Sequence, residues 1–146
     1  MIKDDHKHLL ILELNSTLHK FQEWIKQQKD VLAVGIVGSH ARGEAREDSD
    51  IDVIILSQFP DRYITDISWV DKFGEIKRKF KEDWGVVQTI RAYYEDGLEV
   101  EYSIAPKEWA NINPVNEGTH RVVNDGMIIL CDKEGLLEHL QKAVKK

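Results

Sequence analysis

The sequence has 146 residues, of which 42% are hydrophobic and 32% are charged, the size and composition of one ordinary globular domain. Its formal net charge of -6 argues against broad binding of nucleic acid, which requires a basic surface, and would suit a cationic acceptor. The only cysteine, Cys131, excludes an internal disulfide, and no apolar run approaches the ~20 residues of a membrane span. The N-terminal apolar stretch is too short and too acidic for a signal peptide, so we expect a cytoplasmic protein without membrane contact.

The first predicted elements are a helix and a buried strand. Apolar residues recur at helical spacing from Leu10 to Ile25 and predict an amphipathic helix over residues 9–28. The following run, Val31 to Val37, is short, rich in β-branched residues and apolar at both odd and even positions. This pattern is typical of a strand that is covered on both faces.

The next stretch combines a glycine turn with two carboxylates. Gly38 lets the backbone turn sharply and leaves room for a ligand. If residues 40–46 are helical, Ser39 is the N-cap, where free N–H groups and the helix dipole favour a phosphate. Asp50 and Asp52 open the next apolar strand two residues apart, so both side chains leave the same face. Two carboxylates beside a phosphate-binding turn favour a magnesium site.

The middle of the chain predicts a helical segment. Apolar residues from Ile67 to Phe80 indicate a helix or a broken pair of helices, with Gly74 as the weak point. We interpret its basic side as a solvated face, with an anionic acceptor as the alternative; its members are Lys72, Lys77, Arg78, Lys79 and Lys81.

A hairpin is predicted next. Residues 86–94 and 98–105 have the composition of strands, and Asp96-Gly97 between them is a strong signal for a tight two-residue turn. The second strand alternates, with Glu99 and Glu101 on its polar face.

The C-terminal part predicts a loop, a hairpin and a helix. Residues 111–120 contain proline and glycine and predict a loop, a candidate wall of an acceptor site. Residues 121–131 indicate a second hairpin. Asp132 is positioned to cap a final helix over residues 133–144.

One segment carries a family resemblance. It reads Gly38-Ser39-x-Ala41-Arg42-Gly43, followed by Ser49-Asp50-Ile51-Asp52. This combination resembles the signature of the polymerase-β-like nucleotidyltransferase superfamily. It is most similar to the small bacterial nucleotidyltransferase-domain proteins related to aminoglycoside nucleotidyltransferases and minimal nucleotidyltransferases. The resemblance implies an α+β (α/β-like) nucleotidyltransferase fold, a mixed β-sheet flanked by helices, in one domain over residues 1–146.

The resemblance also implies a reaction and a set of metal ligands. A nucleoside monophosphate, expected to be AMP, would move from a nucleoside triphosphate to a hydroxyl acceptor, with pyrophosphate as the leaving group. Two Mg²⁺ ions ~3.5–4 Å apart would be held by Asp50, Asp52 and a third carboxylate. The third carboxylate of the family lies on a later strand, where Glu101 fits best and Glu99 is the alternative. Glu101 would complete the acceptor-side metal and can act as general base.

Four further residues are expected to bind the nucleotide. Gly38 and Ser39 would hold the β- and γ-phosphates, and Arg42 and Ser49 belong to the same signature. For Arg42 the sequence leaves a second interpretation open, in which it braces the loop by pairing with Glu44 or Asp48.

Three functions compete. The chain could modify a small hydroxylated cation; it could be the minimal-nucleotidyltransferase component of a two-protein, antitoxin-like module that binds or nucleotidylates a helical partner; or it could bind nucleotides without catalysis. Because larger antibiotic-modifying relatives carry an additional helical domain, we expect a homodimer or a partner protein to complete the acceptor site.

Overall fold

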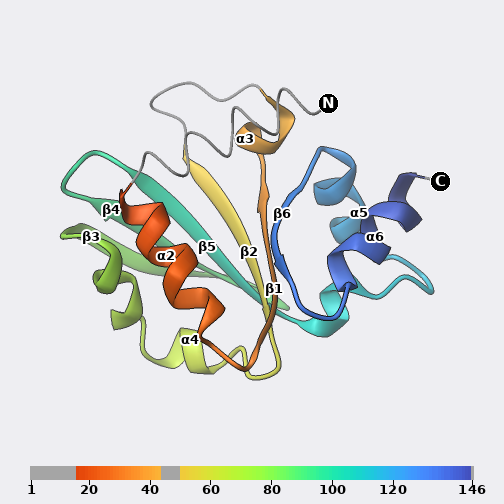
Figure 1. The fold of residues 1–146 in the computed structure, drawn as a ribbon, viewed down its shortest axis with the longest axis horizontal. Helices are drawn as coiled ribbons and strands as arrows, with labels where there is room; N and C mark the ends of the chain where they lie inside the picture. The colour runs from red at the N-terminus through yellow and green to blue at the C-terminus, as the bar shows by residue number, and fades with distance from the viewer. Residues whose placement is uncertain (1–15, 44–49, 146) are drawn as a thin grey trace.

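The computed structural model describes residues 16–43 and 50–145 (Figure 1). The strands are β1 (Val31–Val37), β2 (Ile51–Ser57), β3 (Ile76–Trp84), β4 (Val87–Tyr94), β5 (Glu99–Pro106) and β6 (Ile128–Asp132). The α-helices are α2 (Ser16–Lys26), α3 (Ser39–Arg42), α4 (Arg62–Thr65), α5 (Glu117–Asn124) and α6 (Leu136–Lys145), and the 3₁₀ helices are η1 (Ser68–Phe73) and η2 (Lys107–Ala110). None of the helices in this part of the chain is long and apolar enough to span a lipid bilayer.

The strands form one mixed sheet in the order β3-β4-β5-β2-β1-β6. Strands β2 and β5 run parallel, and every other neighbouring pair is antiparallel. Because β2 and β5 are parallel, both begin at the same edge of the sheet. Asp52 near the start of β2 therefore lies opposite Glu101 near the start of β5.

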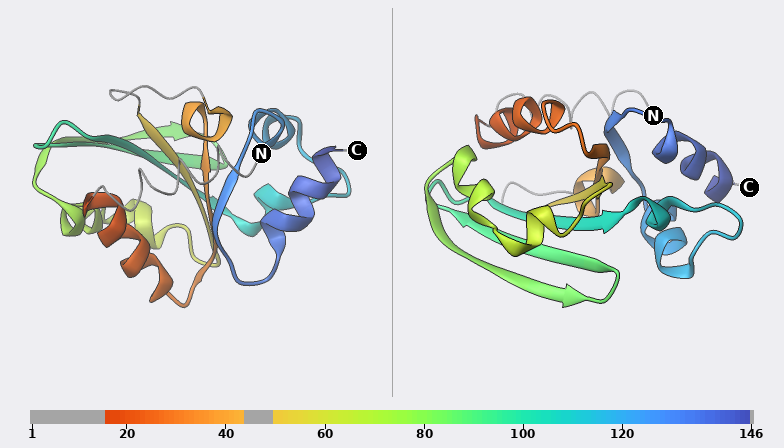
Figure 2. Two further views of the ribbon diagram at one scale, coloured as in Figure 1. Left: turned by 45° about the horizontal axis from the view of Figure 1, so that its top comes forward. Right: turned by 90° about the horizontal axis from the view of Figure 1, so that it is seen from below.

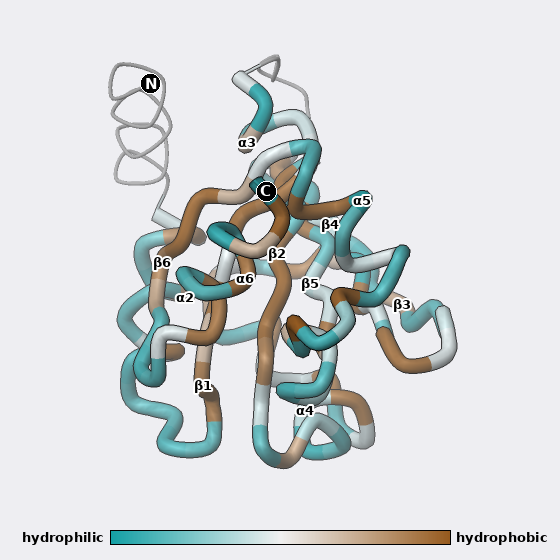
Figure 3. The backbone as a smooth tube through the Cα atoms, turned by 90° about the vertical axis from the view of Figure 1, so that its right-hand side faces the viewer, coloured by the Kyte–Doolittle hydropathy of each residue, from teal (hydrophilic) through white to brown (hydrophobic). Residues whose placement is uncertain are grey.

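Both faces of the central strands are buried, as the apolar runs predict. On one face, α2 and η1 pack through Phe21 and Phe73 against Val53 and Tyr102. On the other face, α5, α6 and η2 pack against Ala33, Ile54 and other residues of the central strands. Figures 1 and 2 show these two groups of helices on opposite sides of the molecule. Figure 3 shows that β1 and β2 are hydrophobic over most of their length.

The predicted helix over residues 67–80 is only partly correct. The 3₁₀ helix η1 ends at Phe73, and after Gly74 the chain forms β3, the edge strand of the sheet. Strand β3 pairs with β4 along its whole length, and this pairing satisfies backbone groups that a helix would have bonded internally. Tertiary pairing therefore overrides a helix-compatible apolar spacing.

The predicted hairpin over residues 86–105 is confirmed as β4 and β5, whereas the predicted hairpin over residues 121–131 is wrong. Residues 117–124 form α5, and only the second arm is a strand, β6. Asn116 caps α5 by accepting hydrogen bonds from the N–H groups of Gly118 and Thr119, so the end of the expected loop is also helical. Asp132 caps the last helix as predicted, but α6 begins at Leu136 rather than at residue 133.

Candidate catalytic site

Four carboxylates meet where β2 and β5 begin. Asp50 directly precedes β2, and Glu99 is the first residue of β5. Asp52 and Glu101 lie opposite each other in the parallel register and interact through their side chains. One carboxylate oxygen from each of Asp50, Glu99 and Glu101 lies within 4.8 Å of the others. The sequence-predicted acidic residues, including the alternative Glu99, are thus brought together where the central strands β2 and β5 begin.

Like charges set the electrostatics of this cluster. Burial, a hydrogen bond shared with Glu101 and the negative charges of Glu101 and Asp50 raise the pKa of Asp52 to about 8. Burial and the neighbouring Asp50 and Glu101 also raise the pKa of Glu99. A carboxylate group held among others prefers the protonated form unless a cation compensates its charge. The cluster is therefore an environment that favours bound cations.

Arg91 is the residue that the sequence analysis missed. It lies at the centre of β4, directly opposite Glu101 on β5. Its guanidinium pairs with Glu101 and with Glu82 of β3, and its Nη1 lies 3.5 Å from Glu99 Oε2. We infer that Arg91 holds the two glutamates of β5 in position.

The predicted two-residue turn at Asp96-Gly97 is wrong, because Tyr94 pairs with Leu98 and the loop has three residues, Glu95 to Gly97. A two-residue turn would have placed Arg91 opposite Tyr102, whereas the three-residue loop places it opposite Glu101.

Gly38 is required next to Asp52. It has a φ of 74°, a backbone conformation that residues with a side chain rarely adopt. A Cβ atom at this position would also collide with Asp52 Oδ2. Gly38 thus allows the chain to turn from β1 into α3 while leaving room for the Asp52 carboxylate.

Ser39 is not the N-cap that the sequence predicts. It is the first residue of α3, and Gly38, which has no side chain to cap the helix, occupies the cap position. Helix α3 is one turn long and ends at Arg42, because Gly43 adopts the left-handed conformation. The expected helix over residues 40–46 therefore does not continue through Gly43, and residues 44–46 lie outside the described residues.

Arg42 braces the start of the site. Its Nη1 donates to Asp125 Oδ2 at 3.1 Å and links α3 to the end of α5. The sequence left open the interpretation that Arg42 braces the loop. The structure shows a bracing contact, but its partner, Asp125, is far away in the sequence. The partners proposed there, Glu44 and Asp48, and the candidate nucleotide ligand Ser49 lie outside the described residues.

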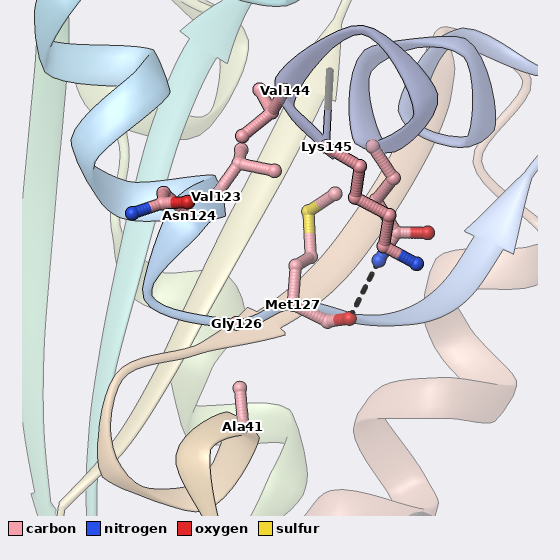
Figure 4. Close-up of a pocket in the computed structure, with 8 residues that line it drawn as sticks. Ala41, Val123, Asn124, Gly126, Met127, Val144 and Lys145 are labelled. Atoms are coloured by element: carbon pink, nitrogen blue, oxygen red, sulfur yellow. Dashed lines mark hydrogen bonds between the residues drawn. The ribbon is translucent and has the colours of Figure 1, made fainter. Parts of the chain in front are cut away.

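A cavity of about 350 Å³ is lined by Ala41 of α3 (Figure 4). It is lined by α3, the end of α5, the start of β6 and α6, and Gln141 closes one wall by donating to the Met127 carbonyl at 2.7 Å. None of the described residues that line it is acidic. The cavity therefore shares no residue with the carboxylate cluster.

The donor set fits a hard divalent cation. Asp50, Asp52, Glu99 and Glu101 supply only oxygen ligands, which Mg²⁺ prefers. Burial and the neighbouring acids raise the pKa of Asp52, and a bound cation would offset both by favouring its ionised form. These four residues are the ones that would hold it.

The segment that carries this site is similar in sequence to known proteins. A family described as "nucleotidyltransferase domain" matches residues 18–113, which include all four carboxylates, Gly38 and Arg91. The chain is 36% identical over 47 residues to the protein adenylyltransferase MntA of Thermococcus cleftensis, across 32% of this chain and 48% of the relative. It is 40% identical over 43 residues to a candidate protein adenylyltransferase of Methanocaldococcus jannaschii, across 30% of this chain and 50% of that relative. The matches thus span about half the length of these curated relatives.

Two solved structures share the fold. An aminoglycoside 6-adenyltransferase from Bacillus subtilis superposes on 64% of this chain with a TM-score of 0.52 and 14% identity. A CCA-adding enzyme in complex with CTP superposes on 94% of this chain with a TM-score of 0.53 and 19% identity. Each match covers 35% of the larger chain. At these identities the likeness concerns the fold alone.

Proposed function

Because this chain belongs to the nucleotidyltransferase domain family, we propose that it transfers AMP from ATP to a hydroxyl group of a protein, with pyrophosphate as the leaving group. The observation that carries the proposal is the convergence of Asp50, Asp52, Glu99 and Glu101 beside the turn at Gly38. The choice of AMP and of a protein acceptor is supported by two relatives that are named protein adenylyltransferases.

The β1 end of the site would hold the triphosphate tail. Gly38 lets the chain turn beside the Asp52 carboxylate, and N–H groups at the start of a helix such as α3 can donate to phosphate oxygens. Ser39 adds a hydroxyl at the same place. Arg42 contributes by fixing α3 against Asp125, which keeps this turn in position.

The carboxylates of β2 and β5 would hold the reacting centre. Divalent cations bound there, for which Mg²⁺ is the proposed ion, supply charge neutralisation for the triphosphate and the developing negative charge. Asp50 and Asp52 would hold these cations, and Glu101 lies on the β5 side, where it can accept the proton of the acceptor hydroxyl. The acceptor oxygen forms a bond to the α-phosphorus, and the bond from that phosphorus to the oxygen bridging to the β-phosphate breaks.

The test is transfer of label from ATP. The purified chain is incubated with Mg²⁺ and each of the four nucleoside triphosphates labelled at the α-phosphate, with and without cell extract. Mass spectrometry then locates any transferred monophosphate. We expect an AMP adduct on protein hydroxyls, seen as a gain of the mass of one AMP less water, with ATP as the preferred donor.

The matched control is Asp50→Asn, which keeps the size of the side chain and removes its charge. Label on proteins that is equal for this variant and the natural sequence would refute catalysis by the cluster. Label that appears only on small molecules would refute a protein acceptor and retain the transferase.

A further inference from the structure

We propose that the acceptor approaches over an exposed platform on β3 and β4, formed by Arg78, Phe80 and Tyr93, and that its hydroxyl lies in a protein segment flanked by acidic residues. This inference rests on the proposed transfer reaction and adds the surface and the chemical class of its acceptor. The three residues are called the β3–β4 platform below.

The platform continues the catalytic face of the sheet. Tyr93 lies opposite Glu99 on one side and opposite Arg78 on the other, while Phe80 lies opposite Arg91, the partner of Glu101. Side chains that are directly opposite in neighbouring strands share a face. Adjacent strands are about 4.8 Å apart, so the platform begins one strand away from the glutamates and extends about 10 Å from them.

The platform is preformed and exposed. The rings of Phe80 and Tyr93 are stacked, with centroids 6.1 Å apart and planes inclined by 24°. The Arg78 guanidinium carbon lies 4.3 Å from the Tyr93 ring centroid and 5.7 Å from that of Phe80. Phe80 is 38% exposed although it is a large apolar residue. Among the described residues, Arg78, Phe80 and Tyr93 belong to neither of the two hydrophobic clusters through which the helices pack on the sheet.

The direction of attack assigns this surface to the acceptor. In an in-line displacement the attacking oxygen and the leaving oxygen lie on opposite sides of the phosphorus. The pyrophosphate would leave toward the turn at Gly38, at the end of β1. Across the sheet, β2 and β5 with the carboxylates come next, and β4 and β3 follow on the far side. The attacking hydroxyl therefore arrives from the side of the platform.

Local charge selects the acceptor against the trend of the whole chain. The net charge of -6 would favour a cation, but the exposed Arg78 makes the β3 side of the platform positive. Two lysines of β3 are engaged within the chain, Lys79 with Asp71 and Lys81 with the carbonyl of Ile64. A polycationic small molecule would meet repulsion at Arg78, whereas an acidic residue beside a hydroxyl would be attracted.

The experiment uses defined peptides and a charge reversal. The probes are Glu-Glu-X-Glu-Glu and Lys-Lys-X-Lys-Lys, with X as Ser, Thr or Tyr, and kanamycin as a polycationic hydroxyl compound. The enzymes are the natural chain, Arg78→Glu, and Arg121→Glu, a matched reversal at an exposed arginine on α5. AMP transfer from labelled ATP gives kcat and KM for each probe.

We expect the natural chain to prefer the acidic peptide by up to about fivefold in kcat/KM, mainly through KM, which is the contribution of one exposed charge pair. Arg78→Glu should reverse the preference, a result that mere loss of folding cannot produce, and Arg121→Glu should retain it. Equal use of both peptides or preferential transfer to kanamycin would overturn the platform assignment. So would a failure to label either peptide under conditions in which proteins of the cell extract are labelled. If instead no acceptor of any kind is labelled, the proposed transfer reaction itself fails.

Discussion

The two ends of the β1–β2 ladder each hold a carboxylate in an opposite environment. At one end, Asp30 precedes β1 and lies beside Ser57, the last residue of β2. At the other end, Asp52 lies opposite Val37, the last residue of β1. Both carboxylates are removed from solvent to a large extent, yet their pKa values move in opposite directions.

Asp30 is surrounded by donors. Its Oδ2 accepts hydrogen bonds from Ser57 Oγ and Tyr63 Oη, each at 2.7 Å, and its Oδ1 accepts one from Arg62 at 3.0 Å. Burial raises the pKa of Asp30, but these hydrogen bonds and the Arg62 charge outweigh it and lower the pKa below its ordinary value. The ionised form is therefore the stable one, and the network fixes the connection from β2 to α4.

Asp52 is surrounded by other acids. Its neighbours are Glu101 and Asp50, and the cation that lowers its pKa, Arg91, is shared with Glu82, Glu99 and Glu101. The comparison teaches that burial alone does not distinguish a structural carboxylate from a functional one. The number of donors does: the protein compensates the charge of Asp30, whereas for Asp52 the proposed site assigns that role to a bound cation.

The largest expected effect is on catalysis. Asp50→Asn and Asp52→Asn should each lower AMP transfer by about 10³-fold or more, because each removes a charged ligand of the reacting centre. Neither should lower the free energy of unfolding appreciably, since each relieves repulsion among like charges. Turnover with labelled ATP and urea unfolding test the two parts. Full turnover in either variant contradicts the site, and strong destabilisation contradicts the comparison.

The second prediction concerns Asp30 and reverses this pattern. Asp30→Ala should lower the free energy of unfolding by about 2–4 kcal/mol, because it leaves the hydroxyls of Ser57 and Tyr63 without their acceptor. The exposed Arg62 adds little to this loss, since solvent screens its charge. Urea unfolding followed by Trp fluorescence measures the change. At a temperature where the variant is folded, transfer should stay within about twofold of the natural chain, and a large loss of kcat there would mean that the two ends are coupled.

The third prediction separates backbone strain from collision at the site. Gly38→Ala should cost about 1–3 kcal/mol of stability and lower transfer as well, because the new Cβ atom displaces the Asp52 carboxylate. Gly85→Ala is the matched control, since Gly85 has a similar φ of 82° but a Cβ atom there would meet none of the described residues within 4 Å. It should lose stability and keep turnover. Equal turnover in both variants would show that Gly38 serves only the turn.

These contrasts also show which parts of the site can be predicted from sequence. The turn at Gly38 and the pair Asp50 and Asp52 belong to one local segment. The glycine is enough to predict the turn, and the two-residue period of a strand is enough to place both aspartates on one face. The choice between Glu99 and Glu101 depends on the register between β2 and β5, which are distant in sequence, and the structure brings both glutamates to the cluster. Arg91 could not be placed beside Glu101, because the predicted two-residue turn puts Arg91 opposite Tyr102 and the observed three-residue loop shifts the pairing by one residue.

The errors in the fold have a similar origin. Ile76 and Phe80 are four residues apart, which suits a helix, but β3 gains its stability from pairing with β4. The Asn124-Asp125-Gly126 sequence ends helix α5 instead of forming a hairpin turn, because turn residues and helix-terminating residues are the same types. Local patterns thus identified the central strands and the motif, and failed where long-range pairing decides the structure or where turns and helix ends use the same residues.

The smallest predicted effect is a difference in pH dependence at the Asp30 end. Because hydrogen bonds hold the pKa of Asp30 below its ordinary value of 3.8, the unfolded chain binds more protons than the folded chain between these two values. Stability therefore rises with pH across that window, and the contribution of the Asp30 charge is lost as the pH falls through the folded-state pKa. Asp30→Asn keeps an acceptor for Ser57 and Tyr63 but cannot ionise. The difference in unfolding free energy between the natural chain and Asp30→Asn should be constant from about pH 5 to 7 and shrink below about pH 4, by no more than about 1.4 kcal/mol per pH unit. Urea unfolding at each pH measures it, and a difference that grows toward low pH would show that the Asp30 network does not favour the ionised carboxylate.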